Sequence, residues 1–146
     1  MTKGDPLPTN YGLGRYLISS QTLGAGTTAE ILFRVFTAGE KAVAVANIAH
    51  FGGDAGEAMQ LFLIPPNAYT SGMKPSDQDG VIAITTSGGM RGATGTVEEP
   101  STVVGVPMDE RWPMTVVPPY GSIACSLDAS NTAAHTVRIG GFEINA

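Results

Sequence analysis

Apolar and polar residues alternate over several short stretches of this chain, as they do in β-strands with one buried face. Ala29–Phe36 places Ile31, Phe33 and Val35 on one side of a strand, with Glu30, Leu32 and Arg34 on the other. Glycines and prolines lie between these stretches, where they favour turns. The other predicted strands are Tyr16–Leu23, Ala42–Phe51, Ala58–Ile64, Val81–Thr86, Thr102–Val106, Ser122–Leu127 and His135–Ala146.

This pattern predicts an all-β protein, a single-domain jelly-roll-like β-sandwich of about eight antiparallel strands. A competing helical signal comes from the alanines within residues 37–49. Gly39 and the β-branched Val43 and Ile48 favour a strand there instead. Valines alternate with alanines in this strand, which gives Ala42–Ala49 a small-residue face suited to close packing against another layer or subunit.

The last strand changes phase near its end. Val137 and Ile139 lie on odd positions, whereas Phe142 and Ile144 lie on even ones. An extra residue at Gly140–Gly141 would keep the apolar face continuous, and glycine tolerates the positive φ of a bulge. We therefore predict a bulge at this glycine pair.

Length and composition divide the chain into an arm and one domain. Residues 1–15 hold two prolines and three glycines without any periodicity, which predicts an extended N-terminal arm, with a disordered terminus as the alternative. Residues 16–146 form the predicted jelly-roll domain. The whole chain of 146 residues is long enough to bury its own core, about 68–70% of its unfolded surface.

Charge is sparse in this protein. Charged residues make up 14% of the chain and the net charge is −5, against about 25% charged residues in ordinary domains. The eight lysines and arginines are scattered, which argues against direct nucleic-acid binding. Low charge instead suggests surface that is buried against partners. The absence of an apolar run near 18 residues or of a signal peptide leads us to expect a soluble protein made in the cytoplasm, not a membrane protein.

Few residues of the chain are candidates for catalysis. His50 and His135 each sit at a predicted strand edge beside a loop, and the single cysteine, Cys125, lies on an apolar strand face as a core residue would. An enzyme would need a histidine within hydrogen-bond reach of Cys125 or a carboxylate. No local nucleophile or metal-ligand motif is present. We expect no enzyme and no catalytic, cofactor or metal site.

Two loops resemble ligand sites only in part. Asp77–Gly80 begins like a calcium loop but lacks the glutamate that would follow, so we interpret it as a turn. Ser87–Gly95 is glycine-rich but lacks the Gly-Lys-Ser/Thr end of a phosphate loop. Trp112 follows Arg111, a pair of residue types favoured at interfaces, although a tryptophan folded back onto the core is the alternative.

The order of elements resembles small jelly-roll virion proteins of tailed bacteriophages, including capsid decoration (cement) proteins. The similarity is carried by the Val/Ala-rich segment at 29–51, the strand ending in L-x-x-P at 58–67 and the turn before Ile123. A V-x-I-x-G-x-E ending matches Val137 to Glu143. Ser122 departs from the family, which usually has a charged residue there.

This resemblance implies a homotrimer on the outside of a phage head, with the major capsid protein as partner. The small-residue faces would pack around the trimer axis, and the arm would reach onto the shell. The alternatives are a tail- or fibre-associated sandwich and a carbohydrate-binding β-sandwich, the latter disfavoured because only 7% of residues are aromatic. The residues expected to bind partners are Asp5, Pro6, Leu7, Pro8, Tyr11, Arg15, Arg111 and Trp112.

Overall fold

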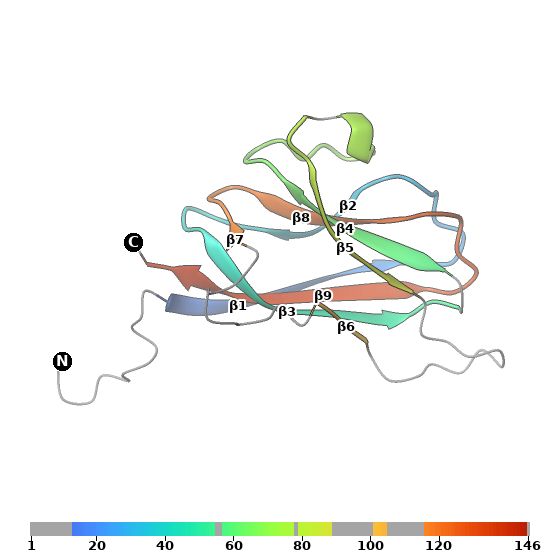
Figure 1. Ribbon diagram of the computed structural model, residues 1–146, viewed down its shortest axis with the longest axis horizontal. Coiled ribbons are helices and arrows are strands. Elements are labelled where there is room, and N and C mark those ends of the chain that lie inside the picture. Colours follow the sequence, from blue (N-terminus) through green and yellow to red (C-terminus); the bar gives the residue numbers. More distant parts are fainter. Residues whose placement is uncertain (1–12, 55–56, 78, 89–100, 105–115, 146) are drawn as a thin grey trace.

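The fold is that of a β-sandwich, seen in a computed structural model that describes residues 13–54, 57–77, 79–88, 101–104 and 116–145. Within these residues, nine strands form two antiparallel sheets that pack face to face, as Figure 1 shows, so the predicted all-β sandwich is confirmed. The strands are β1 (Leu13–Leu23), β2 (Phe33–Thr37), β3 (Val43–Gly52), β4 (Ala58–Ile64), β5 (Ile82–Gly88), β6 (Ser101–Val104), β7 (Val116–Val117), β8 (Ser122–Leu127) and β9 (His135–Ile144).

The strand order is that of a jelly roll. Sheet A has the order β1-β9-β3-β6, with β7 also paired to β3, and sheet B has the order β2-β8-β4-β5. Apart from the two-residue β7, the first strand pairs with the last, the second with the penultimate, and so on inward to β4 with β5. A long antiparallel hairpin rolled up in this way gives the two sheets of the fold.

The last strand, β9, holds sheet A together because it is paired on both edges. His135 lies opposite Leu23 of β1 and opposite Gly52 of β3. Ile139 in turn lies between Ser19 and Ile48. These pairs place the start of β9 at the end of the sandwich where β1 and β3 finish.

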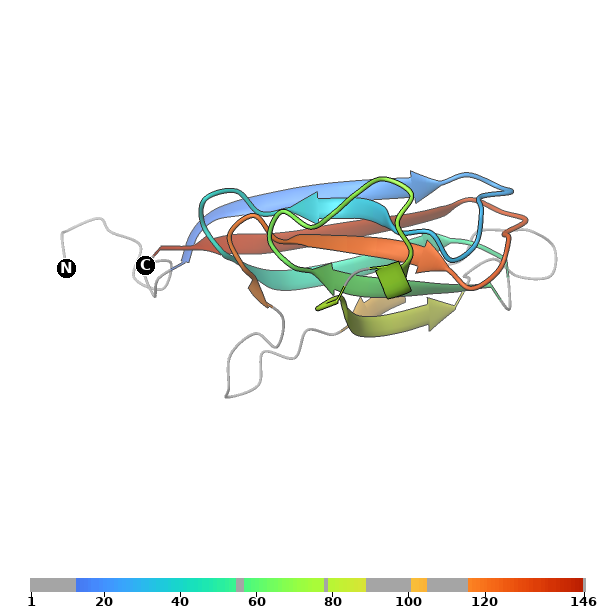
Figure 2. The same ribbon diagram turned by 90° about the horizontal axis from the view of Figure 1, so that it is seen from above.

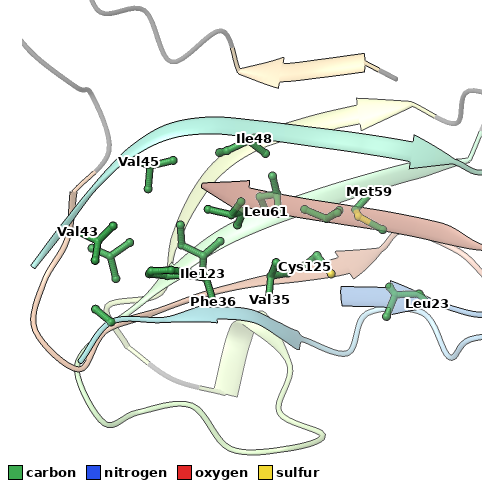
Figure 3. Packing of buried hydrophobic residues seen from close by; sticks show 14 of the residues in the cluster. Leu23, Val35, Phe36, Val43, Val45, Ile48, Met59, Leu61, Ile123 and Cys125 are labelled. Atoms are coloured by element: carbon green, nitrogen blue, oxygen red, sulfur yellow. The ribbon is translucent and has the colours of Figure 1, made fainter. Parts of the chain in front are cut away.

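The main core fills the space between the sheets (Figure 3). Ile123, Cys125 and Leu127 of β8 point into it in alternation, as the sequence pattern predicted. Burial of each such large aliphatic side chain contributes about 1.5–3 kcal/mol. The buried members are Leu23, Val35, Phe36, Ala38, Val43, Val45, Ile48, Met59, Leu61, Val117, Ile123, Cys125, Leu127, Val137 and Ile139.

A second apolar cluster lies on the outer face of sheet B. Leu32, Phe62, Ile64 and Ala124 are buried there with Met73, which belongs to the long β4–β5 loop seen above sheet B in Figure 1. This loop carries a short 3-10 helix and covers the sheet. The cover explains why all six residues of β8 are buried.

The predicted strand at 29–36 is shorter than expected. It begins at Phe33, because Glu30 has a left-handed backbone with φ 62° that interrupts an extended chain. Leu32, expected on the polar side of that strand, is fully buried. Its backbone N–H donates to the carbonyl of Met73 (2.9 Å), which ties it to the covering loop.

Side chains join the two sheets along one side, where Figure 2 shows β1 beside β2. Ser19 Oγ donates to the carbonyl of Val35 (2.6 Å), and Gln21 Nε2 donates to that of Arg34 (3.0 Å). Both acceptors belong to β2, an edge strand of sheet B. These bonds occupy carbonyls that an open edge would leave available for another chain.

The predicted bulge in the last strand is wrong. β9 pairs with β1 without a break through Gly140 and Gly141, and neither glycine has a positive φ. Phe142 therefore lies on the outer face of sheet A, opposite Tyr16, and not in the core. The irregularity lies instead in β3, between Val45 and Asn47.

Gly141 is required for a different reason, which is close packing. A Cβ at this position would lie 2.6 Å from the carbonyl oxygen of Ala44 and 2.7 Å from Cγ1 of Val43. We predict that Gly141→Ala lowers the free energy of unfolding by about 1–3 kcal/mol, because backbone and core must shift. Denaturant unfolding measures this loss.

Gly140→Ala is the matched control. The Cβ added there would meet the hydroxyl end of Tyr16, an exposed side chain that can rotate away. We expect this variant to lose clearly less stability than Gly141→Ala. Equal losses would contradict the packing explanation.

Candidate functional site

The two histidines of the chain meet inside the protein, at the end of the sandwich where β9 begins. His50 Nε2 lies 2.7 Å from His135 Nδ1, and the rings stack with centroids 5.0 Å apart and planes 13° apart. Both side chains are fully buried. They meet because β3 and β9 are neighbours, with Gly52 opposite His135.

Glu57 continues the chain of hydrogen bonds. Its Oε1 accepts from His135 Nε2 and from the backbone N–H of Asp54, both at 2.9 Å. Its Oε2 accepts from the backbone N–H and the hydroxyl of Thr132, and that hydroxyl also contacts Asp54 Oδ2. One carboxylate therefore joins the β3–β4 loop to the β8–β9 loop.

The protonation states follow from these contacts. Burial acts to raise the pKa of Glu57, but the hydrogen bonds from Thr132, Asp54 and His135 outweigh it and lower the pKa to about 2. Burial, followed by the neighbouring His135, lowers the pKa of His50 to about 4. An ionised Glu57 can only accept, so His135 Nε2 carries a proton. Between the two rings, one nitrogen donates and the other accepts.

This arrangement can hold and pass a proton, and it can fix two loops. A base oriented by a carboxylate is also the geometry of catalytic histidines, and His135 with Glu57 meets the requirement stated for an enzyme. Both rings have no exposed surface for a substrate to touch. Burial raises the pKa of Cys125 to about 12, so its thiol remains protonated and weakly nucleophilic.

Sequence reasoning placed both histidines beside loops but missed their contact with each other and with Glu57 and Thr132. The position of each histidine along its predicted strand could have indicated this contact. His50 shares the inward side with Ile48, and His135 shares it with Val137. Two histidines on core-facing positions require polar partners inside the protein.

Of the residues predicted to bind partners, the structure describes Arg15. It lies on β1, which begins at Leu13, within the range predicted for the arm. Its exposed side chain reaches Glu143 at 3.4 Å, and an exposed ion pair of this kind contributes little stability. The others lie outside the described residues, namely Asp5, Pro6, Leu7, Pro8, Tyr11, Arg111 and Trp112.

The outer face of sheet A carries a row of apolar residues across four strands. Tyr16 lies opposite Phe142, Phe142 opposite Ala44, and Ala44 opposite Val116. Tyr16 is 45% exposed, Val116 36% and the neighbouring Ile18 61%. We call these five residues the apolar outer face.

A polar contact lies on the same side of sheet A as the apolar outer face. There the guanidinium of Arg138 stacks over the ring of Phe51 at 5.0 Å. An apolar centre with a polar border is the usual composition of a protein interface. The outer face of sheet B differs, because the protein's own β4–β5 loop covers it.

Other candidate sites are weaker. A cavity of about 490 Å³ beside the covering loop is lined by Glu30, Lys74 and Asp128, and by Phe62 as the one aromatic among the described residues. Within the same part of the chain, no group of three or more metal-ligating side chains is arranged to hold a metal ion. No helix in the described ranges is long and apolar enough to cross a membrane.

Comparisons with known proteins give one distant structural similarity to report. No protein-family model matches the chain, and no curated protein matches it significantly. The chain is similar to a chain of the capsid asymmetric unit of cyanophage Pam1, at 12% identity and a TM-score of 0.39, over 94% of this chain and 89% of that one. Because similarity at this level does not establish a shared fold, the function proposed below rests on the residues of this chain.

The buried histidine pair yields a stability prediction at Gly53, whose φ is 77°. A Cβ there would lie 2.1 Å from Cε1 of His135, so it would overlap sterically with the imidazole ring. We predict that Gly53→Ala lowers the melting temperature strongly, because both the backbone conformation and the ring contact are lost.

Gly72→Ala separates these two effects. Gly72 has a similar φ of 81°, but nothing lies within 4 Å of the added Cβ. Gly72→Ala should lower the free energy of unfolding by about 1 kcal/mol, which is the cost of the backbone conformation alone. If Gly53→Ala cost no more than Gly72→Ala, the ring would not be packed against Gly53.

Proposed function

We propose that this protein is a non-catalytic structural protein of a tailed-phage virion, which binds the outside of the head as a homotrimer and stabilises the shell. The observation that carries the proposal is the difference between the two outer faces of the jelly roll. Sheet B is covered by the protein's own loop, whereas sheet A presents the apolar outer face. The resemblance of the sequence to decoration proteins supports the same function.

The occupant we assign to the apolar outer face is a second copy of this chain. Three side chains of this face, Tyr16, Ile18 and Val116, are 36–61% exposed in the single chain. Around a threefold axis, protruding side chains of this kind on one copy would pack against the next copy in the ring. The small-residue side of β3, which the sequence assigned to subunit packing, lies on this same face.

The assigned contact with the major capsid protein is the N-terminal arm. Prolines restrict the conformations of an extended segment, so it loses less entropy when it docks along a thin interface. Many weakly bound copies that recognise only the assembled shell would stabilise it by mass action. Sparse charge, 14% of residues, fits a protein whose surface is largely used in contacts.

A non-catalytic role is supported by the chemistry of the described site. The histidine rings are fully buried, and the raised pKa of Cys125 keeps its thiol protonated. Glu57 uses both carboxylate oxygens to hold loop atoms in place. The contacts of these groups described above are with other parts of the same chain.

The trimer can be tested with Ile18→Asp, which puts a charge on the apolar outer face. We expect light scattering to give an assembly of several chains for the wild type and about one chain, near 15.0 kDa, for the variant. The fold should be preserved, because Ile18 is 61% exposed in the single chain. Burying an unpaired charge in an interface is what would break the assembly.

Ser20→Asp is the control, since Ser20 is an exposed polar residue two positions further along the same strand. It should keep the wild-type mass. A wild-type protein that is a single chain, or an Ile18→Asp variant of unchanged mass, would overturn the trimer.

Attachment to the shell can be tested by deleting residues 2–12, which end just before β1. We expect the wild type to sediment with undecorated heads of the phage that encodes it, and the truncated protein to stay largely in the supernatant. Its oligomeric mass should be unchanged. Equal sedimentation of both proteins would contradict the role of the arm, and failure of the wild type to sediment would contradict the function.

A further inference from the structure

The cavity beside the covering loop of sheet B has a buried floor with polar groups on it. Its volume is about 490 Å³, within the range of pockets that hold small-molecule ligands. Gln60 of β4 and Ser126 of β8 lie opposite each other on this floor, on the outer side of sheet B. Phe62, two residues further along β4, adds an apolar surface. The floor therefore combines polar groups with an aromatic ring.

The hydroxyl of Ser126 is available to a bound molecule. Ser126 is 2% exposed, yet its Oγ makes no hydrogen bond within the described part of the chain. Among the same residues, no side-chain oxygen or nitrogen is both sealed from solvent and without a hydrogen-bond partner. The Ser126 hydroxyl must therefore open into the cavity that this residue lines. Buried polar groups normally have partners, so the floor of the cavity has hydrogen-bonding capacity left for a ligand.

The edge of the cavity carries three exposed charged residues, which are Glu30, Asp128 and Lys74 of the covering loop. The backbone N–H of Glu30 donates to the carbonyl of Leu127 (2.8 Å), which holds Glu30 beside the end of β8, where Asp128 follows. The backbone N–H of Lys74 donates to Asp77 Oδ2 (2.6 Å), which fixes the start of the short 3-10 helix. In the described ranges, none of the three charged side chains at this edge forms an ion pair. The edge therefore presents both acceptors and a donor.

A sugar ring matches these groups better than an ion does. Each sugar hydroxyl can donate to a carboxylate and accept from an ammonium or amide group, and the C–H face of the ring can pack on Phe62. A ligand hydroxyl also replaces the water that would otherwise bond to Ser126. An anion would meet two carboxylates at the edge, and the described residues hold no group of three or more metal-ligating side chains for a metal ion.

We propose that this cavity is a binding site for one sugar unit of a glycan. The site is built within one chain and does not rest on the proposed virion function. Assembly through the apolar outer face of sheet A would leave it open, because it lies on the outer side of sheet B. Only 7% of the chain is aromatic, which argues against a platform of several rings. This site instead uses hydrogen bonds around the single ring of Phe62.

Amide NMR of the full-length protein tests the site with methyl glycosides of glucose, galactose, mannose and N-acetylglucosamine. Each is raised to tens of millimolar, because a ligand of this size binds weakly. We expect at least one glycoside to shift the amides of Lys74, Ser76, Leu127 and Asp128 in a saturable manner, while the amides of β1 in sheet A stay unchanged. If none of the four shifts these amides, the proposal is wrong.

Inorganic phosphate and the diamine putrescine are titrated in the same way, as probes for an anion and a cation. We expect neither to give saturable shifts around the cavity. Saturable shifts with one of them and none with the glycosides would mean that the cavity takes a charged ligand, which overturns the sugar assignment.

Ser126→Ala removes the hydroxyl from the floor of the cavity. We expect the affinity for the responding glycoside to fall roughly five- to tenfold, the effect of one lost hydrogen bond. The melting temperature should stay close to that of the wild type, because this hydroxyl has no partner in the described part of the protein. Unchanged affinity would contradict the role of Ser126.

Ser122→Ala is the matched control on the same side of β8. Ser122 is also buried, but its hydroxyl lies 3.1 Å from that of Thr37 and the residue is not among those that line the cavity. This variant should have a lower melting temperature and bind the glycoside as the wild type does. An equal loss of affinity in both variants would show that binding does not depend on the cavity floor and would overturn the site.

Discussion

The pairing of β9 with both β1 and β3 is the constraint on which the rest of the structure depends. The last strand of the chain lies inside sheet A, so that sheet is incomplete until the C-terminal residues are in place. The pairing determines where Gly141 meets the backbone of Ala44 and brings His135 against His50. Pairs such as Leu23 with His135 are far apart in sequence, which is typical of slowly folding β-proteins.

The same strand order leaves one outer face of the sandwich covered and the other exposed. The β4–β5 connection is long enough to fold over sheet B and bury Phe62 and Met73 against it. Across sheet A, in contrast, the register aligns Tyr16, Phe142 and Val116 in one exposed row. A row built from four strands exists only in the folded protein, so assembly through it would select folded chains.

Much of the fold could be predicted from the sequence, because alternation of apolar residues is a local property. It located most strands, the buried Cys125 and the inward valines of β3. It failed at Gly140–Gly141, where the change of phase reflects an outward Phe142 that packs on Tyr16, a residue of another strand. The histidine network and the cover of sheet B also depend on contacts between distant segments, which no local pattern encodes.

Cryo-electron microscopy of undecorated phage heads mixed with this protein is the most direct test that it binds the shell as a trimer. We expect trimers on the outer surface of the shell, with the outer faces of sheet A turned toward the trimer axis and the covered face of sheet B turned away from it. Shells that remain bare, or bound molecules whose Tyr16 and Ile18 face solvent, would contradict it.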